Sequence, residues 1–237
     1  SKEPRIDLLV TPFVTIFTGV ALSMLIAPPI GQAASSLGKI IMFATELQPF
    51  LMGLIVSVLV GIALTLPISS AAICAALGLT GLAGGAAVAG CCAQMVGFAV
   101  ISYRENGVGG LVSQGIGTSM LQLSNIVHNP KIWIAPILTS AITGPVATCI
   151  FGLQMNGTPV SSGMGTCGLV GQLGVYSGWV NEIENGAREQ IYMFDWFGLV
   201  MISFVLPAII CPVIHLWVKK LGWVADGDLS LSRKNQV

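Results

Sequence analysis

Residues 81–103 read GLAGGAAVAGCCAQMVGFAVISY, a stretch that carries no charged side chain and in which small residues recur four positions apart. In helical conformation, about 20 apolar residues cross the hydrocarbon core of a bilayer. Gly81 and Gly85, and then Ala86 and Gly90, fit the small-xxx-small pattern that lets membrane helices approach closely. The stretch therefore predicts a tightly packed transmembrane helix.

Charge is scarce in the rest of the chain as well. Of the 237 residues, 54% are hydrophobic and only 8% are charged, whereas about a quarter of the residues in a soluble domain are charged. No charge lies between Glu46 and Arg104, or between Lys131 and Glu182. This scarcity disfavours the alternative of an unusually apolar soluble α/β core. The net charge is zero and gives no support for a nucleic-acid partner.

Apolar runs bounded by proline or charge define the expected elements. They predict an all-α integral membrane protein, a polytopic helical bundle with re-entrant segments and about five full spans. A short helix is expected at 69–79, between the second and third spans. The expected spans are residues 8–28, 50–66, 81–103, 132–152 and 196–217.

Three segments between the spans are rich in glycine or polar residues, namely 32–47, 107–123 and 153–178. Broken or polar backbone at membrane depth is tolerated only inside protein or beside water. We therefore expect re-entrant or interfacial segments that enclose a binding site. Residues 179–195 combine charges with tryptophan and tyrosine, which predicts an extramembrane loop with an aromatic belt.

Polar side chains in these apolar surroundings are the candidate site residues, because charge inside a bilayer usually marks a substrate or ion path. Glu46 is the first candidate for accepting hydrogen bonds from sugar hydroxyls, and an interfacial charge facing water is the alternative. A surface turn at 104–106 and simple interhelical hydrogen bonding by the amides are further alternatives. The predicted substrate-binding residues are Glu46, Gln48, Gln94, Arg104, Glu105, Asn106, Gln114, Thr118 and Asn125.

His128, in a predicted loop, is the candidate for proton transfer, with a solvated loop histidine as the alternative. The GxGxxG match at residues 163–168 follows no strand, so it indicates a backbone bend and not a dinucleotide site. The chain contains no Walker A, HExxH or GxSxG motif and no self-contained catalytic motif. Its six cysteines have no metal-binding spacing, and we expect neither a metal nor a cofactor.

Six stretches of the chain resemble a known family. They are Asp7-Leu-Leu-Val-Thr-Pro12, Ala44-Thr-Glu-Leu-Gln-Pro-Phe50, Leu66-Pro-Ile-Ser-Ser-Ala-Ala72, Gly90-Cys-Cys-Ala-Gln-Met-Val-Gly-Phe98, Tyr103-Arg-Glu-Asn-Gly107 and Gly163-Met-Gly-Thr-Cys-Gly-Leu-Val-Gly-Gln172. Together they are similar to the membrane IIC-like proteins of the bacterial phosphotransferase system (PTS), specifically the small stand-alone group. The resemblance covers nearly all of residues 5–230.

The resemblance implies a multi-pass protein of the bacterial inner membrane, a homodimer, that would be the translocating subunit of a sugar phosphotransferase. A cytoplasmic IIB partner would phosphorylate the sugar, so this chain would contribute by positioning it. Members of the group are usually longer ahead of the Asp7 motif, so we expect an N-terminal portion that this chain lacks. We expect a IIC-like domain over residues 1–225 and a cytoplasmic tail over 226–237, since Lys219 and Lys220 follow the last span.

A second function remains open from the sequence. The few intramembrane charges and the low aromatic content, 7%, suit an apolar ligand at least as well as a sugar. On this alternative the chain is a non-transporting membrane regulator or sensor that binds a lipid on a IIC-like scaffold.

Overall fold

The computed structural model describes residues 47–231 continuously and, before them, residues 14, 16–20, 22, 24, 32, 36, 39–41 and 43–45. Contacts divide the chain into two units, residues 1–39 and residues 40–237. In the first unit the described residues are helical. The expected span 8–28 and segment 32–47 fall largely outside the described residues, so both stay predictions.

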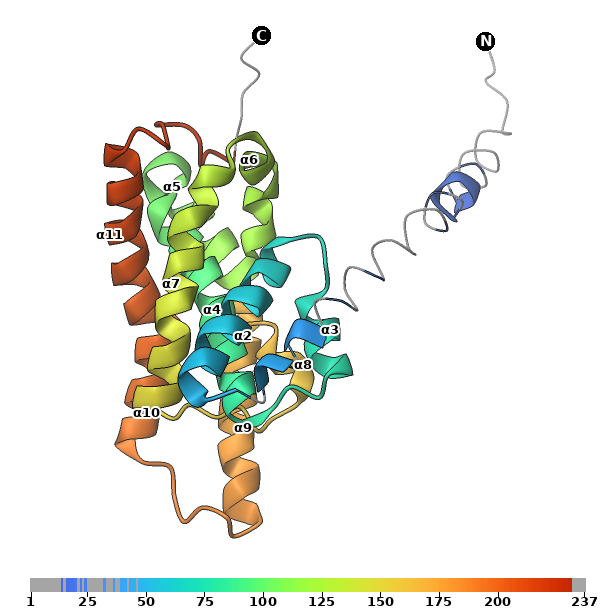
Figure 1. The fold of residues 1–237 in the computed structure, drawn as a ribbon, viewed down its shortest axis with the longest axis vertical. Coiled ribbons are helices and arrows are strands. Elements are labelled where there is room, and N and C mark those ends of the chain that lie inside the picture. Colours follow the sequence, from blue (N-terminus) through green and yellow to red (C-terminus); the bar gives the residue numbers. More distant parts are fainter. Residues whose placement is uncertain are drawn as a thin grey trace. The chain divides into compact units, whose positions relative to one another are not determined.

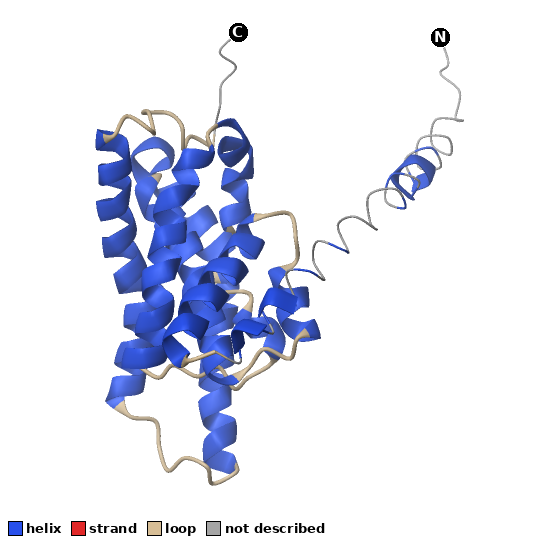
Figure 2. Ribbon diagram, in the orientation of Figure 1, coloured by secondary structure: helices blue, strands red, loops and turns tan. Residues whose placement is uncertain are grey.

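The described part of the second unit is helical and contains no strand beyond an isolated bridge between Gly81 and Met155 (Figure 2). Its α-helices are α2 (Pro49–Thr65), α3 (Ser70–Ala76), α4 (Gly81–Ile101), α5 (Tyr103–Val112), α6 (Leu123–His128), α7 (Ile134–Pro145), α8 (Pro159–Ser162), α9 (Val170–Glu184), α10 (Met193–Val200) and α11 (Leu206–Lys220). The 3₁₀ and π turns are η1 (Ser113–Gly117), η2 (Ser119–Gln122), η3 (Pro130–Trp133), η4 (Val146–Ile150), η5 (Cys167–Leu169) and η6 (Met201–Val205). The predicted all-α class is confirmed.

Helix α4 lies at the centre of the bundle and packs against α2, α7 and α11 (Figure 1). Its glycines let other backbone segments come close. A Cβ atom on Gly90 would lie 1.9 Å from the Ser57 carbonyl oxygen of α2, and one on Gly85 would lie 1.8 Å from the Leu153 carbonyl oxygen. The predicted close packing through small residues is confirmed at these two positions.

Proline sets both ends of α2. Pro49 occupies the first turn, where a missing N–H costs nothing and the fixed φ suits a helix. Pro67 forces the residue before it out of helical geometry, and Leu66 is accordingly extended, with φ −76° and ψ 160°. The bounds expected from the sequence, 50–66, are therefore reproduced to within one residue.

Three helical stretches are long and apolar enough to cross a membrane, namely Gly81–Ile101, Pro130–Ile150 and Met193–Lys220. The apolar helix Pro49–Thr65 is shorter. Two of the long stretches contain a π turn beside a proline, η4 directly after Pro145 and η6 just before Pro207. Proline has no N–H for the helical ladder, and a wider turn accommodates the interruption.

Segments 107–123 and 153–169 contain the predicted breaks, whereas residues 170–178 belong to the regular helix α9. Gly107 has φ +59° within 107–123, and the helix gives way to extended backbone at Thr118. In 153–178, an irregular stretch precedes α8, and Gly165 and Gly168 turn the chain with positive φ. Their re-entrant placement stays a prediction. The expected loop at 179–195 was wrong for 179–184, which form the last turns of α9, and for 193–195, which begin α10.

Candidate functional site

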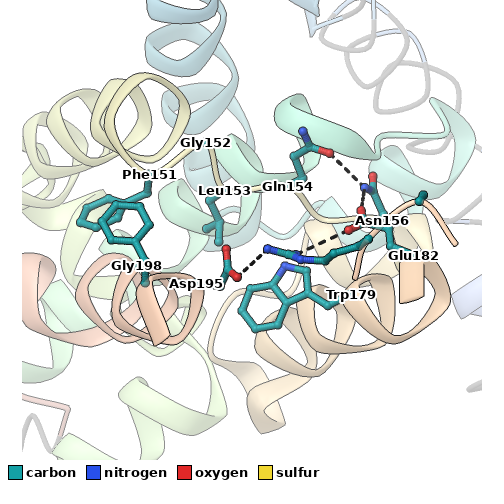
Figure 3. Close-up of a pocket in the computed structure, with 12 residues that line it drawn as sticks. Phe151, Gly152, Leu153, Gln154, Asn156, Trp179, Glu182, Asp195 and Gly198 are labelled. Carbon is teal, nitrogen blue, oxygen red and sulfur yellow. Dashed lines mark hydrogen bonds and ion pairs between the residues drawn. The ribbon is translucent and has the colours of Figure 1, made fainter. Parts of the chain in front are cut away.

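A cavity of about 550 Å³ lies where the irregular stretch after η4 meets α9 and the start of α10 (Figure 3). We call it the Arg188 cavity. Its walls combine aromatic rings, amides and charged side chains. The lining residues are Phe151, Gly152, Leu153, Gln154, Asn156, Trp179, Glu182, Ala187, Arg188, Phe194, Asp195 and Gly198.

Helix α4 holds the irregular stretch of the wall in place. Gly81 N–H donates to the Met155 carbonyl at 3.0 Å, and Met155 N–H donates back to the Gly81 carbonyl at 2.9 Å. The close approach of Leu153 to Gly85 requires the absence of a side chain there. The glycines at the start of α4 therefore position Gln154 and Asn156 on the cavity wall.

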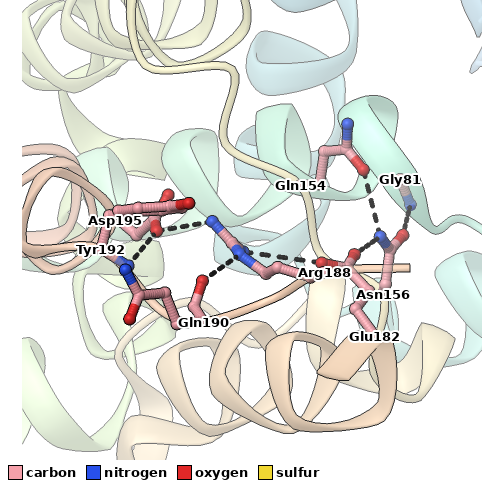
Figure 4. Close-up of polar contacts among 8 residues, drawn as sticks. All are labelled: Gly81, Gln154, Asn156, Glu182, Arg188, Gln190, Tyr192 and Asp195. Atoms are coloured by element: carbon pink, nitrogen blue, oxygen red, sulfur yellow. Dashed lines mark hydrogen bonds and ion pairs between the residues drawn. The ribbon is translucent and has the colours of Figure 1, made fainter. Parts of the chain in front are cut away.

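Arg188 joins the two helices on either side of the cavity (Figure 4). Its guanidinium lies 2.5 Å from an Asp195 carboxylate oxygen on α10 and 3.5 Å from a Glu182 oxygen on α9. Its Nε donates to the Gln190 carbonyl at 3.0 Å. The planar fork of arginine allows these contacts at once, which a lysine ammonium could not make in the same geometry.

The guanidinium also lies over the Trp179 ring, with its carbon 5.6 Å from the ring centroid. Trp179 is only 3% exposed and meets Trp196 edge to face at 5.4 Å between ring centroids. Phe151 and Phe194 add a second pair of rings, 5.5 Å apart. The cavity is therefore flanked by aromatic side chains, of which Trp179 is held in its orientation by packing.

Asn156 connects the carboxylate side of the cavity to α4. Its Nδ2 donates to Glu182 and, at 3.1 Å, to Gln154 Oε1, while its Oδ1 accepts from Gly81 N–H at 3.0 Å. Two carboxylates against one guanidinium leave one net negative charge on the lining. Carboxylate and amide groups next to aromatic faces can bind a ligand that presents hydroxyl groups and an apolar ring face.

None of the site residues expected from the sequence lines the Arg188 cavity. Glu46 lies outside the described residues. Gln48 is exposed at the start of α2. Thr118 accepts from Met120 N–H at 3.2 Å, and His128, which is exposed, lies 2.7 Å from the Ser124 carbonyl. Their substrate roles stay predictions.

Gln94 is completely buried and joins several helices. Its Oε1 accepts from Trp133 Nε1 at 2.8 Å and from the Thr65 hydroxyl at 3.3 Å, and its Nε2 donates to the Ser140 hydroxyl at 3.3 Å. These contacts link α4 with α2, η3 and α7. They match the alternative of interhelical hydrogen bonding that the sequence left open for such amides.

The remaining expected residues gather at the end of the bundle formed by α5, η2 and α6. Glu105, Asn106 and Asn125 hydrogen-bond the chain at residues 227–231, and Gln114 bonds Gln122 beside them. Arg104 is exposed and, with Glu105, lines a separate cavity of about 170 Å³ next to α11. The structure thus brings these residues into one polar cluster and places the chain's own C-terminal residues against it, while their substrate role stays a prediction.

The sequence did not indicate the Arg188 cavity, because its charged residues were interpreted as part of a surface loop. Glu182, Arg188 and Asp195 flank aromatic residues directly after a glycine-rich segment. That combination of opposite charges, tryptophan and flexible backbone is the signal that could have indicated a site. Among the described residues, no group of three His, Cys, Asp or Glu side chains could hold a metal ion.

Comparison with known proteins adds one match. The family described as "Phosphotransferase system, EIIC" matches residues 1–231. Neither a curated protein nor a solved structure shows a significant match. The match spans nearly the whole chain and agrees with the apolar helices long enough to cross a membrane. The chain therefore belongs to the EIIC family of the phosphotransferase system, and is a multi-pass membrane component of a sugar transporter of that type.

Proposed function

We propose that the Arg188 cavity is the sugar-binding site of this transporter component. One observation carries the proposal: Glu182, Asp195 and Asn156 converge beside Trp179 in a cavity of about 550 Å³. Ligand cavities in proteins are usually about 300–1,000 Å³ and combine apolar walls with a few fixed polar groups. A hexose would offer hydroxyls to the carboxylates and amides, and its C–H face to the aromatic rings.

The polar atoms still available in the cavity favour a hydroxyl-bearing ligand. Asp195 uses one oxygen for Arg188 and for Tyr192 N–H, at 2.8 Å. Its other oxygen and the Gln154 Nε2 make no hydrogen bond within the described part of the chain. An acyl chain in this place would cover partly buried charges without replacing their hydration, which is unfavourable. The lipid-binding alternative therefore becomes an outcome of the test.

The finer features expected from the resemblance belong to the same proposal. The chain works in the bacterial inner membrane with its C-terminus in the cytoplasm, since Lys219 and Lys220 follow the last span. It forms a homodimer, and a cytoplasmic IIB-type phosphocarrier phosphorylates the sugar after it has passed from the cavity to the cytoplasmic side. Glu46 and Gln48 stay candidates for a further contact with the sugar.

The test uses the purified full chain and measures thermal unfolding with a panel of hexoses, hexitols and fatty acids, because a ligand that binds the folded state raises the unfolding temperature. We expect a sugar to stabilise the protein and Asp195→Asn to abolish the shift. This variant keeps an oxygen for Tyr192 N–H and removes the charge. Glu184→Gln is the matched control, since Glu184 is exposed on α9 and does not line the cavity.

Two results would refute the sugar site. One is stabilisation by fatty acids with no response to any sugar. The other is a sugar response that Asp195→Asn leaves intact. Glu46→Gln provides a separate measurement, because loss of the response in that variant alone would move the site to the residues predicted from the sequence.

A further inference from the structure

The charge of the Arg188 cavity narrows the class of sugar that it would bind, and this step rests on the sugar site proposed above. We infer that the preferred ligand is an amino sugar, a hexose in which a protonated amine replaces one hydroxyl. Three features of the lining carry the inference: an excess of negative charge, a carboxylate oxygen without a partner, and aromatic faces in the same cavity. A neutral hexose would leave the excess charge unpaired.

The excess charge follows from the charged side chains of the lining. They are two carboxylates, Glu182 and Asp195, and one guanidinium, that of Arg188. The guanidinium is already engaged by both carboxylates and by the Gln190 carbonyl. The Glu182 and Asp195 side chains are 24% and 19% exposed, so water reaches them only in part. A partly buried charge without a counter-charge is unfavourable, and a ligand with one positive charge would make the lining neutral.

The available contact for this positive charge is at Asp195. One Asp195 oxygen faces Arg188 and accepts from Tyr192 N–H at 2.8 Å, and the other makes no hydrogen bond within the described part of the chain. Both Glu182 oxygens, by contrast, have partners, Arg188 for one and Asn156 for the other. A hydrogen bond between an ammonium and a carboxylate is roughly twice as strong as one between neutral groups. The free Asp195 oxygen therefore favours an amine over a hydroxyl.

Aromatic rings of the lining are compatible with a cation as well. Phe151 and Phe194 line the cavity together with Asp195, and their ring centroids lie 5.5 Å apart (Figure 3). The protein already holds one cation in this manner, because the Arg188 guanidinium lies over the Trp179 ring. Ring faces attract cations within about 6 Å. The aromatic wall therefore suits both the C–H face of a sugar and an ammonium attached to it.

The chain around the cavity has the same sign of charge. Residues 182–195 contain four acidic residues and one basic residue, namely Glu182, Glu184, Glu189 and Asp195 with Arg188. The field of such a segment attracts cations and repels anions as they approach. The cavity should therefore discriminate in two directions, for an amino sugar over the neutral hexose and for the neutral hexose over a sugar acid.

The experiment measures affinities of the purified full chain by isothermal titration calorimetry. Glucosamine, galactosamine and mannosamine are each compared with the parent hexose at about pH 6.5, where an amine with roughly the pKa of an α-amino group is protonated. We expect at least one amino sugar to bind about tenfold more tightly than its parent, because its charged donor makes the stronger hydrogen bond. The N-acetyl form, which keeps the nitrogen without the charge, should not show this gain, and glucuronate should bind most weakly.

Two variants test whether the preference comes from the charge of the lining. Glu182→Gln removes one carboxylate charge and keeps an oxygen for Asn156, so the ratio of amino-sugar affinity to hexose affinity should fall to near one. Glu184→Gln is the matched control, because Glu184 is exposed on α9 and does not line the cavity. This control should keep the ratio of the unaltered chain. The comparison among ligands on the unaltered chain stands even if Glu182→Gln does not fold.

The outcomes separate the two proposals. If no sugar of the panel binds, the sugar site and the preference for an amino sugar both fail. If hexoses bind and their amino forms bind no more tightly, the cavity remains a sugar site and the amino-sugar inference alone is overturned. An equal gain for the N-acetyl forms, or an equal fall in the ratio for Glu182→Gln and Glu184→Gln, would also overturn it. Hexose binding that strengthens with added sodium chloride would assign the excess charge to an inorganic cation instead.

Discussion

Arg188 pairs with two carboxylates and Lys219 with one, and the surroundings of these ion pairs make their contributions to stability differ. The side chains of Arg188, Glu182 and Asp195 are about one fifth to one quarter exposed, whereas Asp226, the partner of Lys219, is 87% exposed. Water screens the second pair almost fully, and exposed pairs contribute little to stability. At the residue scale, burial therefore decides which ion pairs contribute to the free energy of unfolding.

We expect Arg188→Gln to lower the free energy of unfolding by about 1–3 kcal/mol, between the values typical of exposed and buried ion pairs. The reason is that Glu182 and Asp195 would keep their charges without a cation between them. Arg188→Lys should recover only part of the loss, because lysine cannot bridge both carboxylates. Thermal unfolding of the purified chain measures this, with the exposed Glu189→Gln as control. Equal stability of Arg188→Gln and the control would contradict the account.

The exposed ion pair between Asp226 and Lys219 should contribute little to stability. Lys219 holds the pKa of the Asp226 carboxyl below its usual range, first through a hydrogen bond and then through its charge. A lowered pKa adds stability above the ordinary Asp value, and that stability is lost as pH falls through the folded-state pKa. Because Asp226 is exposed, we expect Asp226→Asn to leave the pH profile of unfolding nearly unchanged between pH 3 and pH 7. A marked loss of stability at neutral pH would show that the pair is shielded from water.

At the scale of the helices, close backbone contact positions α2 against α4. A Cβ atom on Gly90 would meet the Ser57 backbone, which cannot move aside as a flexible side chain would. We expect Gly90→Ala to destabilise the protein by about 1–3 kcal/mol through overpacking. Gly109→Ala is the matched control, since an added Cβ atom there has no neighbour within 4 Å and alanine favours a helix. Comparable losses in the two variants would argue against a tight α2–α4 contact.

Gln94 also holds α4 against its neighbours, through hydrogen bonds to α2, α7 and η3. Gln94→Leu removes the acceptor of Trp133 Nε1 and leaves buried polar groups unpaired. The expected loss in unfolding free energy is about 1–3 kcal/mol. Gln48→Leu, at an exposed amide, should change stability little. If Gln94→Leu were neutral, the amide would have no role in joining the helices and a substrate role would gain support.

At the scale of the whole molecule, the stretch Met193–Lys220 joins the Arg188 cavity to the lysine-rich end. Its 28 residues span about 40 Å at 1.5 Å per residue, enough to cross the bilayer. Asp195 lies near its first residue and Lys219 near its last. The cavity and the C-terminal lysines therefore lie at opposite ends of one helical stretch that is long enough to cross the membrane.

This arrangement predicts that an epitope inserted after Gly186 binds antibody on intact spheroplasts, while a C-terminal epitope binds only on inverted vesicles. Gly186 is exposed in the connection between α9 and α10. An epitope on a known periplasmic protein and one on a cytoplasmic protein calibrate the two preparations. Detection of both inserted epitopes on the same side would contradict the predicted orientation.

The sequence by itself determined the class of the protein and most of its helices. Apolar length, proline positions and glycine spacing act locally, so α2, α4 and the long helical stretches could be placed from residues 49–220 alone. It also indicated Glu105, Asn106, Gln114 and Asn125 as candidate site residues, a role that stays a prediction. The broken backbone at 107–123 and 153–169 followed from glycine content.

Only the tertiary structure decided which polar groups meet. Asn156 and Glu182 come together across 26 positions, and Glu105 and Leu229 across 124, so no local pattern could report either contact. From the sequence, Trp179 was interpreted as part of an aromatic belt and Arg188 as a loop charge. The packing of the helices places both residues at one cavity. Long-range approach of this kind depends on how whole helices pack, and the close contacts at Gly85 and Gly90 determine it here.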